Sequence, residues 1–215
     1  MTGADTVCSG TRGTLRDAAL PRTSGRVYRP REDNHRGLSC AALTSPDVSI
    51  APPAASIRLA TARDAEAIRS IYNVEVENHT STFDLEPRSL EEQRSWLNQR
   101  SGAFSAVVAV IDGEVVGFAS LSPYKERAAY RTTVEDSVYV SREHSGAGIG
   151  RLLMTYLIDV ARESGFHSVI ARIEASSSGS RALHERCGFE LVGIERQVGR
   201  KFNRWLDVAV MQLLL

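Results

Sequence analysis

The chain has 215 residues, carries 26 basic and 26 acidic side chains, and is 42% hydrophobic. This length accommodates one domain or two small ones, with an ordinary apolar fraction for a core. The balanced charge, without a basic stripe interleaved with aromatic residues, argues against nucleic-acid binding. The cysteines, Cys8, Cys40 and Cys187, are widely separated and lack zinc-site spacing, which indicates a reducing compartment. The apolar stretches are too short to span a bilayer, so we expect a cytoplasmic protein without a membrane partner.

Residues 1–56 differ in composition from the rest of the chain. They are rich in Ser, Thr, Arg, Gly and Pro, show no apolar periodicity, and end in Ala51-Pro-Pro-Ala-Ala-Ser56. Such a segment cannot bury enough apolar surface to offset its chain entropy. We therefore expect a disordered N-terminal extension, either a genuine tail or the product of an early start codon. An organelle targeting segment is the alternative, although scattered acidic residues count against it.

Residues 57–215 have the pattern of a mixed α/β domain. Thr61 and Ser89 each begin a capping-box pattern that predicts a helix, and Asp112-Gly113 predicts a hairpin turn. The expected strands are 57–60, 104–111, 114–121, 134–140, 168–174, 190–197 and 205–214, and the two later helices are expected to end near 164 and 187. This order predicts an antiparallel meander followed by a βαβ crossover, in one central mixed sheet flanked by helices.

The most informative segment runs from Asp136 to Met154. A short β-branched and aromatic run, Val138-Tyr-Val140, predicts a strand, and an apolar helical pattern begins at about Arg151. Between them stand three glycines at alternate positions, Gly146, Gly148 and Gly150. This arrangement can hold phosphate, because glycines let the backbone approach closely and because the first N–H groups and the dipole of a helix favour an anion.

Several interpretations of this glycine loop compete. A P-loop requires Lys and then Ser or Thr after the last glycine, but Arg151 and Leu152 follow it. A dinucleotide fingerprint requires a further glycine at position 151. The coenzyme A pyrophosphate loop of the GCN5-related N-acetyltransferases (GNAT), with the motif Arg/Gln-x-x-Gly-x-Gly/Ala, matches residues 145–150 except at Ser145. A tight glycine turn without a ligand also fits these residues alone.

Eight further segments between residues 57 and 215 point to one branch of that superfamily. They are Ile71-Tyr-Asn73, Thr80-Ser-Thr-Phe83, Gly117-Phe-Ala-Ser120, Ala129-Tyr-Arg131, Thr133–Val140, Ser180–His184, Gly188-Phe189 and Val198–Asp207. In these segments the domain resembles the phosphinothricin and methionine sulfoximine acetyltransferases. The resemblance implies the GNAT fold, acetyl-CoA as co-substrate without a metal, a homodimer, and a role in herbicide or antibiotic resistance.

The resemblance also implies which residues carry the chemistry. Glu135 matches the general base, acting through water on the substrate ammonium, although an exposed strand-end carboxylate is the alternative. His184 stands where many members carry a tyrosine general acid, and it either donates a proton, orients the thiol or is a satisfied helix histidine. The residues expected to bind the coenzyme are Val138, Tyr139, Val140, Gly146, Ala147, Gly148, Ile149, Gly150, Arg151 and Ser177.

Two segments match the substrate-contacting parts of the family. Lys125, Glu126 and Arg127 form the first, and Glu135, Asp136 and Ser137 form the second. A cation in the first segment suits an amino-acid carboxylate, whereas a solvated charge run is the alternative. Ser145 and Ser177 depart from the family pattern, because longer side chains usually stand there.

The sequence therefore predicts an acetyl-CoA-dependent N-acetyltransferase that acetylates the free amine of a small amino-acid analogue by direct attack in a ternary complex. Phosphinothricin and methionine sulfoximine are the model acceptors. A protein or peptide Nα-acetyltransferase is one alternative, and a non-catalytic acyl-CoA-binding sensor is the other.

Overall fold

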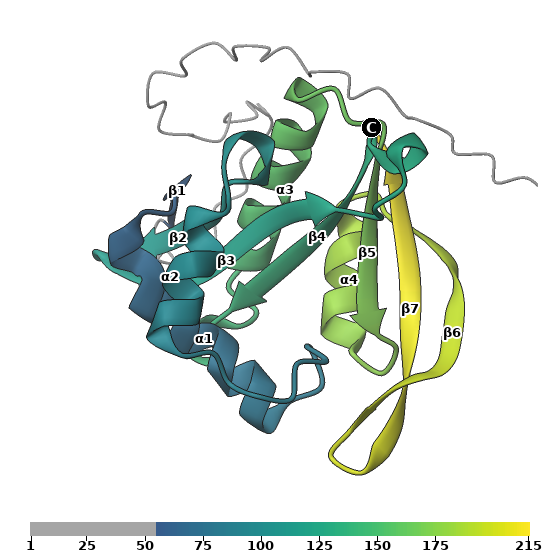
Figure 1. Cartoon of the computed structure of the whole chain (residues 1–215), viewed down its shortest axis with the longest axis horizontal. Coiled ribbons are helices and arrows are strands. Elements are labelled where there is room, and N and C mark those ends of the chain that lie inside the picture. The colour runs from purple at the N-terminus through teal and green to yellow at the C-terminus, as the bar shows by residue number, and fades with distance from the viewer. Residues whose placement is uncertain (1–54) are drawn as a thin grey trace, which may run out of the picture.

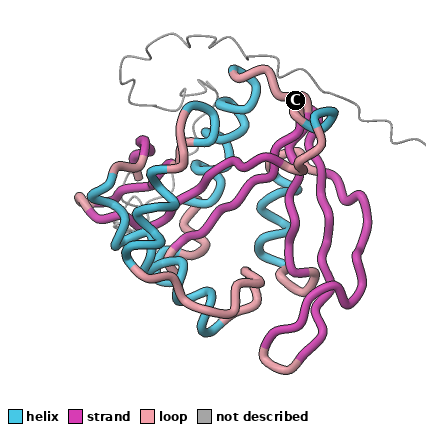
Figure 2. The backbone as a smooth tube through the Cα atoms, in the orientation of Figure 1, coloured by secondary structure: helices cyan, strands magenta, loops and turns pink. Residues whose placement is uncertain are grey.

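The structure, a computed structural model, describes residues 55–215. In this range the chain forms a seven-stranded mixed sheet with helices on both faces (Figures 1 and 2). The strands are β1 (Ser56–Leu59), β2 (Val107–Ile111), β3 (Glu114–Pro123), β4 (Thr133–Val140), β5 (Ser168–Glu174), β6 (Glu190–Lys201) and β7 (Arg204–Leu214). The helices are α1 (Ala65–Asn78), α2 (Leu90–Asn98), α3 (Ile149–Glu163) and α4 (Ser178–Arg186). The predicted element order and mixed sheet are confirmed. The prediction for residues 1–56 lies outside the described residues, apart from Ala55 and Ser56.

The local signals for helix and turn act as predicted. Ser89 accepts a hydrogen bond from the N–H of Glu92, and the Glu92 carboxylate accepts one from the N–H of Ser89, so the capping box at the start of α2 is closed. Asp112 and Gly113 have φ values of 50° and 87°, the left-handed pair that a two-residue hairpin requires. These contacts fix where α2 begins and how β2 and β3 connect.

Two strand boundaries differ from the prediction by three residues or more. The strand expected from residue 104 begins at Val107, because Gly102–Phe104 forms a 3₁₀ turn that starts with a positive φ at Gly102. The strand expected to end at residue 197 continues to Lys201. Gln197 has a φ of 52° and lies in a shift of the β6–β7 register, so it marks a bulge within the strand and not its end.

Two apolar layers cover opposite faces of the sheet. Successive residues of a strand point to opposite faces. Accordingly, Val107 and Ala109 of β2 join the core beneath α3, whereas Val108 between them joins Ile68 and Phe118 beneath α1. The sheet is thus held between α1 and α2 on one side and α3 and α4 on the other (Figure 1).

The centre of the sheet is incomplete between β4 and β5. These parallel strands pair only over 133–135 with 168–170. Beyond Glu135, β4 still pairs with β3 as far as Val140, but it diverges from β5 (Figure 1). The β5-facing backbone edge of β4 from Asp136 onward is therefore left without a neighbouring strand.

Candidate functional site

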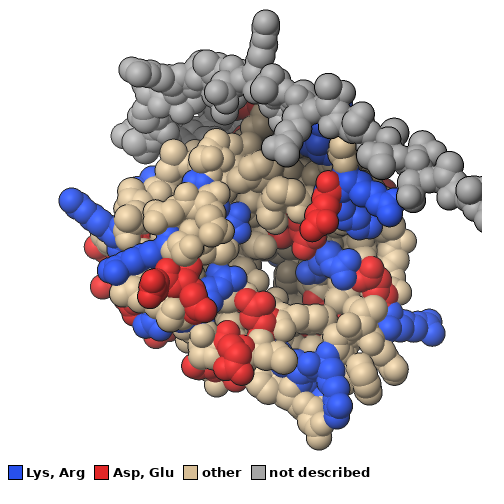
Figure 3. Space-filling view, viewed as in Figure 1, with Lys and Arg blue, Asp and Glu red and all other residues tan. Residues whose placement is uncertain are grey.

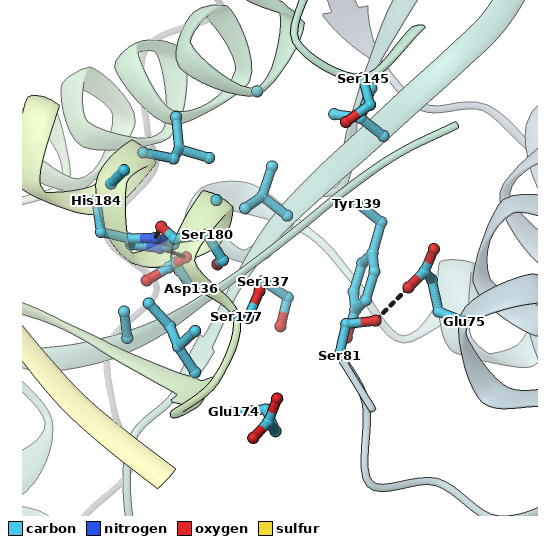
Figure 4. A pocket seen from close by; sticks show the side chains of 18 of the residues that line it. Glu75, Ser81, Asp136, Ser137, Tyr139, Ser145, Glu174, Ser177, Ser180 and His184 are labelled. Atoms are coloured by element: carbon cyan, nitrogen blue, oxygen red, sulfur yellow. Dashed lines mark hydrogen bonds and ion pairs between the residues drawn. The ribbon is translucent and has the colours of Figure 1, made fainter. Parts of the chain in front are cut away.

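A cavity of about 1290 Å³ occupies the opening between β4 and β5. Four parts of the chain line it: the end of β4, the glycine loop, the β5–α4 connection with α4, and the connection between α1 and α2. Figure 3 shows a hollow at the centre of this face, with acidic and basic side chains around it. Figure 4 shows polar side chains from these parts converging on the same space.

The glycine loop has a backbone that only glycine adopts easily. Gly146 and Gly148 have φ values of 83° and 82°, and Gly148 is the residue that precedes α3. No side chain caps the start of α3, so its first N–H groups remain available to an anion. Of the loop residues predicted to bind the coenzyme, Gly146, Gly148, Gly150 and Arg151 line the cavity, whereas Ala147 does not line it.

Ile149, the hydrophobic residue of the loop, points into the core and away from the cavity. Ile149 is 2% exposed and belongs to the core beneath α3, so its predicted contact with the coenzyme is limited to its backbone. Gly150 lies against α4, where an added Cβ would come within 3.1 Å of the Leu183 side chain. The loop is thus held by packing on its inner side and open on its outer side.

The edge of β4 supplies the second part of the predicted coenzyme site. Ser137, Val138, Tyr139 and Val140 all line the cavity. Their other backbone edge is paired with β3, with Ala119 opposite Val138 and Gly117 opposite Val140. A ligand with amide groups can pair with the free edge as an additional strand would.

Glu135 stands where β4 and β5 begin to separate. It is the last residue of β4 to pair with β5, opposite Ile170, and its side chain lines the cavity. Burial raises the pKa of the Glu135 carboxyl, and the nearby Arg172 opposes that rise. Arg172 is itself paired with Glu195, at 2.6 Å between Nη2 and Oε2. A half-buried carboxylate with a raised pKa is suited to accept a proton.

Asp136 and His184 form a buried pair beside Glu135. The Nε2 atom of His184 lies 3.0 Å from Oδ2 of Asp136, and both side chains are 2% exposed. Nδ1 of His184 lies 2.7 Å from the carbonyl oxygen of Ser180, to which it can only donate. Burial opposes the imidazolium, but the Asp136 carboxylate and the Ser180 carbonyl outweigh it and raise the pKa of His184. Both ring nitrogens of His184 are therefore engaged within the protein (Figure 4).

The structure separates the two predicted substrate segments. Asp136 and Ser137 line the main cavity together with Glu135. Lys125, Glu126 and Arg127 instead surround a separate hollow of about 400 Å³ beside Tyr130. The Lys125 ammonium lies 4.6 Å from the ring centre of Tyr124 and 5.3 Å from that of Tyr130. Within this single chain, the cation predicted for the acceptor carboxylate is thus not part of the main cavity.

The two departures from the family motif both line the cavity. Ser145 and Ser177 lie on different sides of it (Figure 4). Two arginines near Ser145 differ in their partners. Arg142 is paired with the buried Glu75, at 2.8 Å and 2.5 Å. Arg151 lines the cavity and forms no ion pair with any residue between 55 and 215. Arg151 is therefore the cation beside the glycine loop that is free to meet a phosphate.

Sequence reasoning missed one wall of the cavity. Ser81, Thr82 and Phe83 from the α1–α2 connection line it, together with Glu75 of α1 and Glu174 at the end of β5. Only the family resemblance of Thr80-Ser-Thr-Phe83 singled out this stretch, because no local pattern connects it with β5. Among residues 55–215, no cluster of three or more His, Cys, Asp or Glu side chains is arranged to hold a metal ion.

The cavity thus combines an open strand edge, the uncapped start of a helix and a half-buried carboxylate. Such a combination can hold a phosphate-bearing ligand next to a group that accepts a proton. Residues 57–210 match the acetyltransferase (GNAT) domain family. The chain therefore belongs to the GNAT family of acetyltransferases. None of the helices in residues 55–215 combines the length and the apolar character that a bilayer crossing needs.

Three known proteins place the chain within this family. An L-methionine sulfoximine/L-methionine sulfone acetyltransferase of Pseudomonas aeruginosa is 40% identical over 163 residues, which cover 75% of this chain and 95% of that protein. The crystal structure of a phosphinothricin acetyltransferase from Sinorhizobium meliloti in complex with acetyl-CoA is 39% identical, with a TM-score of 0.72, and covers 75% of this chain and 88% of that one. The crystal structure of a ribosomal-protein-alanine N-acetyltransferase from Brucella melitensis is 44% identical, with a TM-score of 0.72. The match covers 74% of this chain and 99% of that one.

Proposed function

We propose that this protein transfers the acetyl group of acetyl-CoA to the free amine of a small amino-acid analogue, such as methionine sulfoximine or phosphinothricin. The observation that carries the proposal is the position of Glu135, which lines the cavity where β4 and β5 separate, directly before the free edge of β4. The similarity to acetyltransferases named for these acceptors supports the substrate class.

The coenzyme side of the site follows from the free backbone groups. The glycine loop and the start of α3 hold the pyrophosphate of acetyl-CoA, with Arg151 as an additional cation. The pantetheine arm pairs with the β4 edge from Val138 to Val140. A backbone N–H on this edge then faces the thioester oxygen and stabilises the negative charge that develops on it.

The amine requires a base because it arrives as an ammonium ion without a lone pair. Glu135 accepts one proton from it, directly or through a water molecule. The neutral nitrogen then attacks the thioester carbon, a C–N bond forms, and the C–S bond breaks with its electron pair on sulfur. The nitrogen loses its second proton at this stage, and the thiolate takes up a proton directly or through solvent to leave as the neutral thiol of coenzyme A. Glu135 afterwards returns its proton to solvent.

The leaving thiolate needs little assistance, since a free thiol has a pKa of about 8.5. His184 has both ring nitrogens engaged, by Asp136 and by the carbonyl of Ser180. We therefore assign His184 an orienting role, in which its pair with Asp136 fixes α4 against β4 beside the thioester. Both substrates are bound when the acetyl group moves, and no acetyl-enzyme forms.

A thiol-release assay tests the proposal. The full chain is incubated with acetyl-CoA and, in turn, phosphinothricin, methionine sulfoximine, methionine sulfone, free amino acids and a peptide with N-terminal alanine. The products are identified by mass spectrometry. We expect acetylation of at least one of the small amines. Binding of acetyl-CoA without turnover on any amine would overturn the proposal in favour of an acyl-CoA sensor.

The peptide in this panel addresses a second candidate function. The similarity to a ribosomal-protein-alanine N-acetyltransferase favours an acceptor at a protein N-terminus. Turnover of the peptide at a higher kcat/KM than any small amine would select this function. The residues assigned to acetyl-CoA and to proton removal would keep their roles.

A further inference from the structure

Two of the segments that resemble the acetyltransferase family have no role in the chemistry described above. They are Thr80–Phe83, between α1 and α2, and Val198–Asp207, which covers the connection between β6 and β7. More than a hundred residues separate them in the sequence, but they meet at one side of the cavity. In Figure 1 the α1–α2 connection and the β6–β7 hairpin both lie at the open end of the gap between β4 and β5.

The first two residues of Thr80–Phe83 are each attached to a buried carboxylate. The Thr80 hydroxyl donates to Glu174 at 3.2 Å, and Glu174 is 8% exposed. The Ser81 hydroxyl donates to Glu75, which is 5% exposed and is also held by Arg142 (Figure 4). One end of the segment is thus fastened to β5 and to α1.

The third residue is attached to the hairpin. The hydroxyl of Thr82 lies 2.8 Å from that of Tyr72, and its carbonyl accepts a hydrogen bond of 2.9 Å from Lys201 Nζ. Lys201 is 4% exposed and also donates to the carbonyl of Glu75. Because three successive residues are tied to different elements, the position of Phe83 is set by the surrounding fold.

Phe83 rests on a glycine of β6 and lines the cavity. The residue is 39% exposed, which leaves part of the ring open to a ligand. A Cβ at Gly199 would lie 2.5 Å from Cδ2 of Phe83 and 3.0 Å from Cζ. The ring can therefore occupy this place only because residue 199 has no side chain. At Gly193, on the same strand, an added Cβ would meet nothing within 4 Å.

We propose that Phe83, seated on Gly199, is a specificity-determining residue that contacts the side chain of the amine acceptor. The glycine loop and the β4 edge are taken by the coenzyme, so the acceptor lies against the opposite wall. On that wall Ser81 and Thr82 are polar, and the Phe83 ring is the apolar surface of the segment. The ring favours an acceptor whose short side chain carries a methyl or methylene group. This inference rests on the proposed function.

A set of glycine variants tests this role. Gly199→Ala places a Cβ where the Phe83 ring lies and therefore displaces the ring. Gly193→Ala is the matched control on the same strand. The probes are alanine, 2-aminobutyrate, norvaline and methionine sulfone, with kcat/KM measured for each. A change of one methylene in an apolar pocket alters kcat/KM by about 10-fold or more. We expect Gly199→Ala to change the ratio of kcat/KM between the shortest and the longest acceptor by about tenfold. The affinity for acetyl-CoA should not change, and Gly193→Ala should leave the kcat/KM ratio as it is in the wild type.

The double variant identifies the cause. If Gly199→Ala acts through the ring, Phe83→Ala and the Gly199→Ala/Phe83→Ala double variant should have the same acceptor ratios. Unchanged ratios in an active, folded Gly199→Ala protein would overturn the inference and leave the proposed function intact. A wild-type protein that acetylates no amine overturns the proposed function and this inference together. If Gly199→Ala does not fold, Phe83→Ala alone decides, and unchanged acceptor ratios in that variant overturn the inference.

Discussion

The two walls of the cavity are built in different ways. The wall that we assign to the coenzyme is one continuous stretch, from Val138 to Arg151, and its shape depends on backbone conformation at Gly146 and Gly148. The wall that we assign to the acceptor, Thr80–Phe83, depends on side chains from α1, β5 and β6 that hold it in place. Coenzyme binding should therefore respond to changes in local backbone geometry. Acceptor choice should respond to remote packing.

Glu135 lies between the two walls, and its substitution should have the largest effect on the rate of acetyl transfer. Glu135→Gln keeps the shape of the side chain and removes the base, which typically costs about 10²–10⁴-fold in rate. We expect a fall of that size in kcat at neutral pH, with little change in acetyl-CoA affinity and partial recovery at high pH, where free amine is more abundant. Glu163→Gln, on the exposed end of α3, is the control. Near wild-type turnover in Glu135→Gln would remove Glu135 from the mechanism.

The raised pKa of Glu135 gives this variant a second readout. A carboxyl whose folded-state pKa is raised contributes stability below its unfolded pKa, and this contribution is lost as pH rises through the folded pKa. The ionised, half-buried carboxylate is therefore a cost at neutral pH. Glu135→Gln should melt at the same temperature as the wild type or higher at pH 7. In the wild type, the acid limb of kcat/KM should lie above pH 4.5, the ordinary value for this group.

Gly148→Val tests the coenzyme wall. Valine at a φ of 82° costs on the order of 1–3 kcal/mol in backbone strain. An added Cβ would meet no protein atom within 4 Å, so the side chain would project into the space assigned to the pyrophosphate. We expect acetyl-CoA to bind about 100-fold more weakly in calorimetry. Gly113→Val is the matched control, because Gly113 has a φ of 87°, equally open surroundings and a place in the β2–β3 turn. Equal acetyl-CoA affinity in both variants would contradict the assignment of the loop.

A smaller effect is expected at Arg151. A hydrogen bond to a charged group contributes about 1.5–3 kcal/mol, and less where solvent screens it. Arg151→Ala should weaken acetyl-CoA binding by about tenfold at low salt and by less at high salt. Arg162→Ala, near the opposite end of α3, should change nothing. Affinity that does not change in Arg151→Ala would show that backbone groups alone hold the phosphate.

Removal of residues 1–54 should change neither substrate binding at the two walls nor the stability of the domain. Their composition predicts no packed core, so a chain that begins at Ala55 should keep its kcat/KM and its melting temperature. Thermal denaturation of the two chain lengths under identical conditions makes this comparison. A loss of several degrees in the shorter chain would show that the N-terminal residues stabilise the domain.

The same contrast explains how much of the fold the sequence could predict. Capping at Ser89, the turn at Asp112-Gly113 and the strand before the glycine loop depend on neighbouring residues, and all were predicted. The end of β6 was not, because Gln197 adopts a positive φ only within the β6–β7 bulge. A local pattern carries no information on such a register shift.

In the candidate site, too, the sequence could predict only what depends on neighbouring residues. The glycine loop could be located by its motif, and Glu135 by the family resemblance of Thr133–Val140. The pairing of Asp136 with His184 joins residues 48 positions apart, and the contact of Thr80 with Glu174 joins residues 94 apart. These contacts arise only when the sheet forms and β4 diverges from β5. They could not be read from periodicity or spacing.

The central claim is that the two walls hold both substrates at once, so that the acetyl group passes directly from thioester to amine. Initial rates measured over a grid of acetyl-CoA and amine concentrations, together with the intact mass of protein incubated with acetyl-CoA alone, test it most directly. We predict intersecting lines in double-reciprocal plots and a protein mass without an added acetyl group. Parallel lines, with one acetyl group on the protein, would contradict the account.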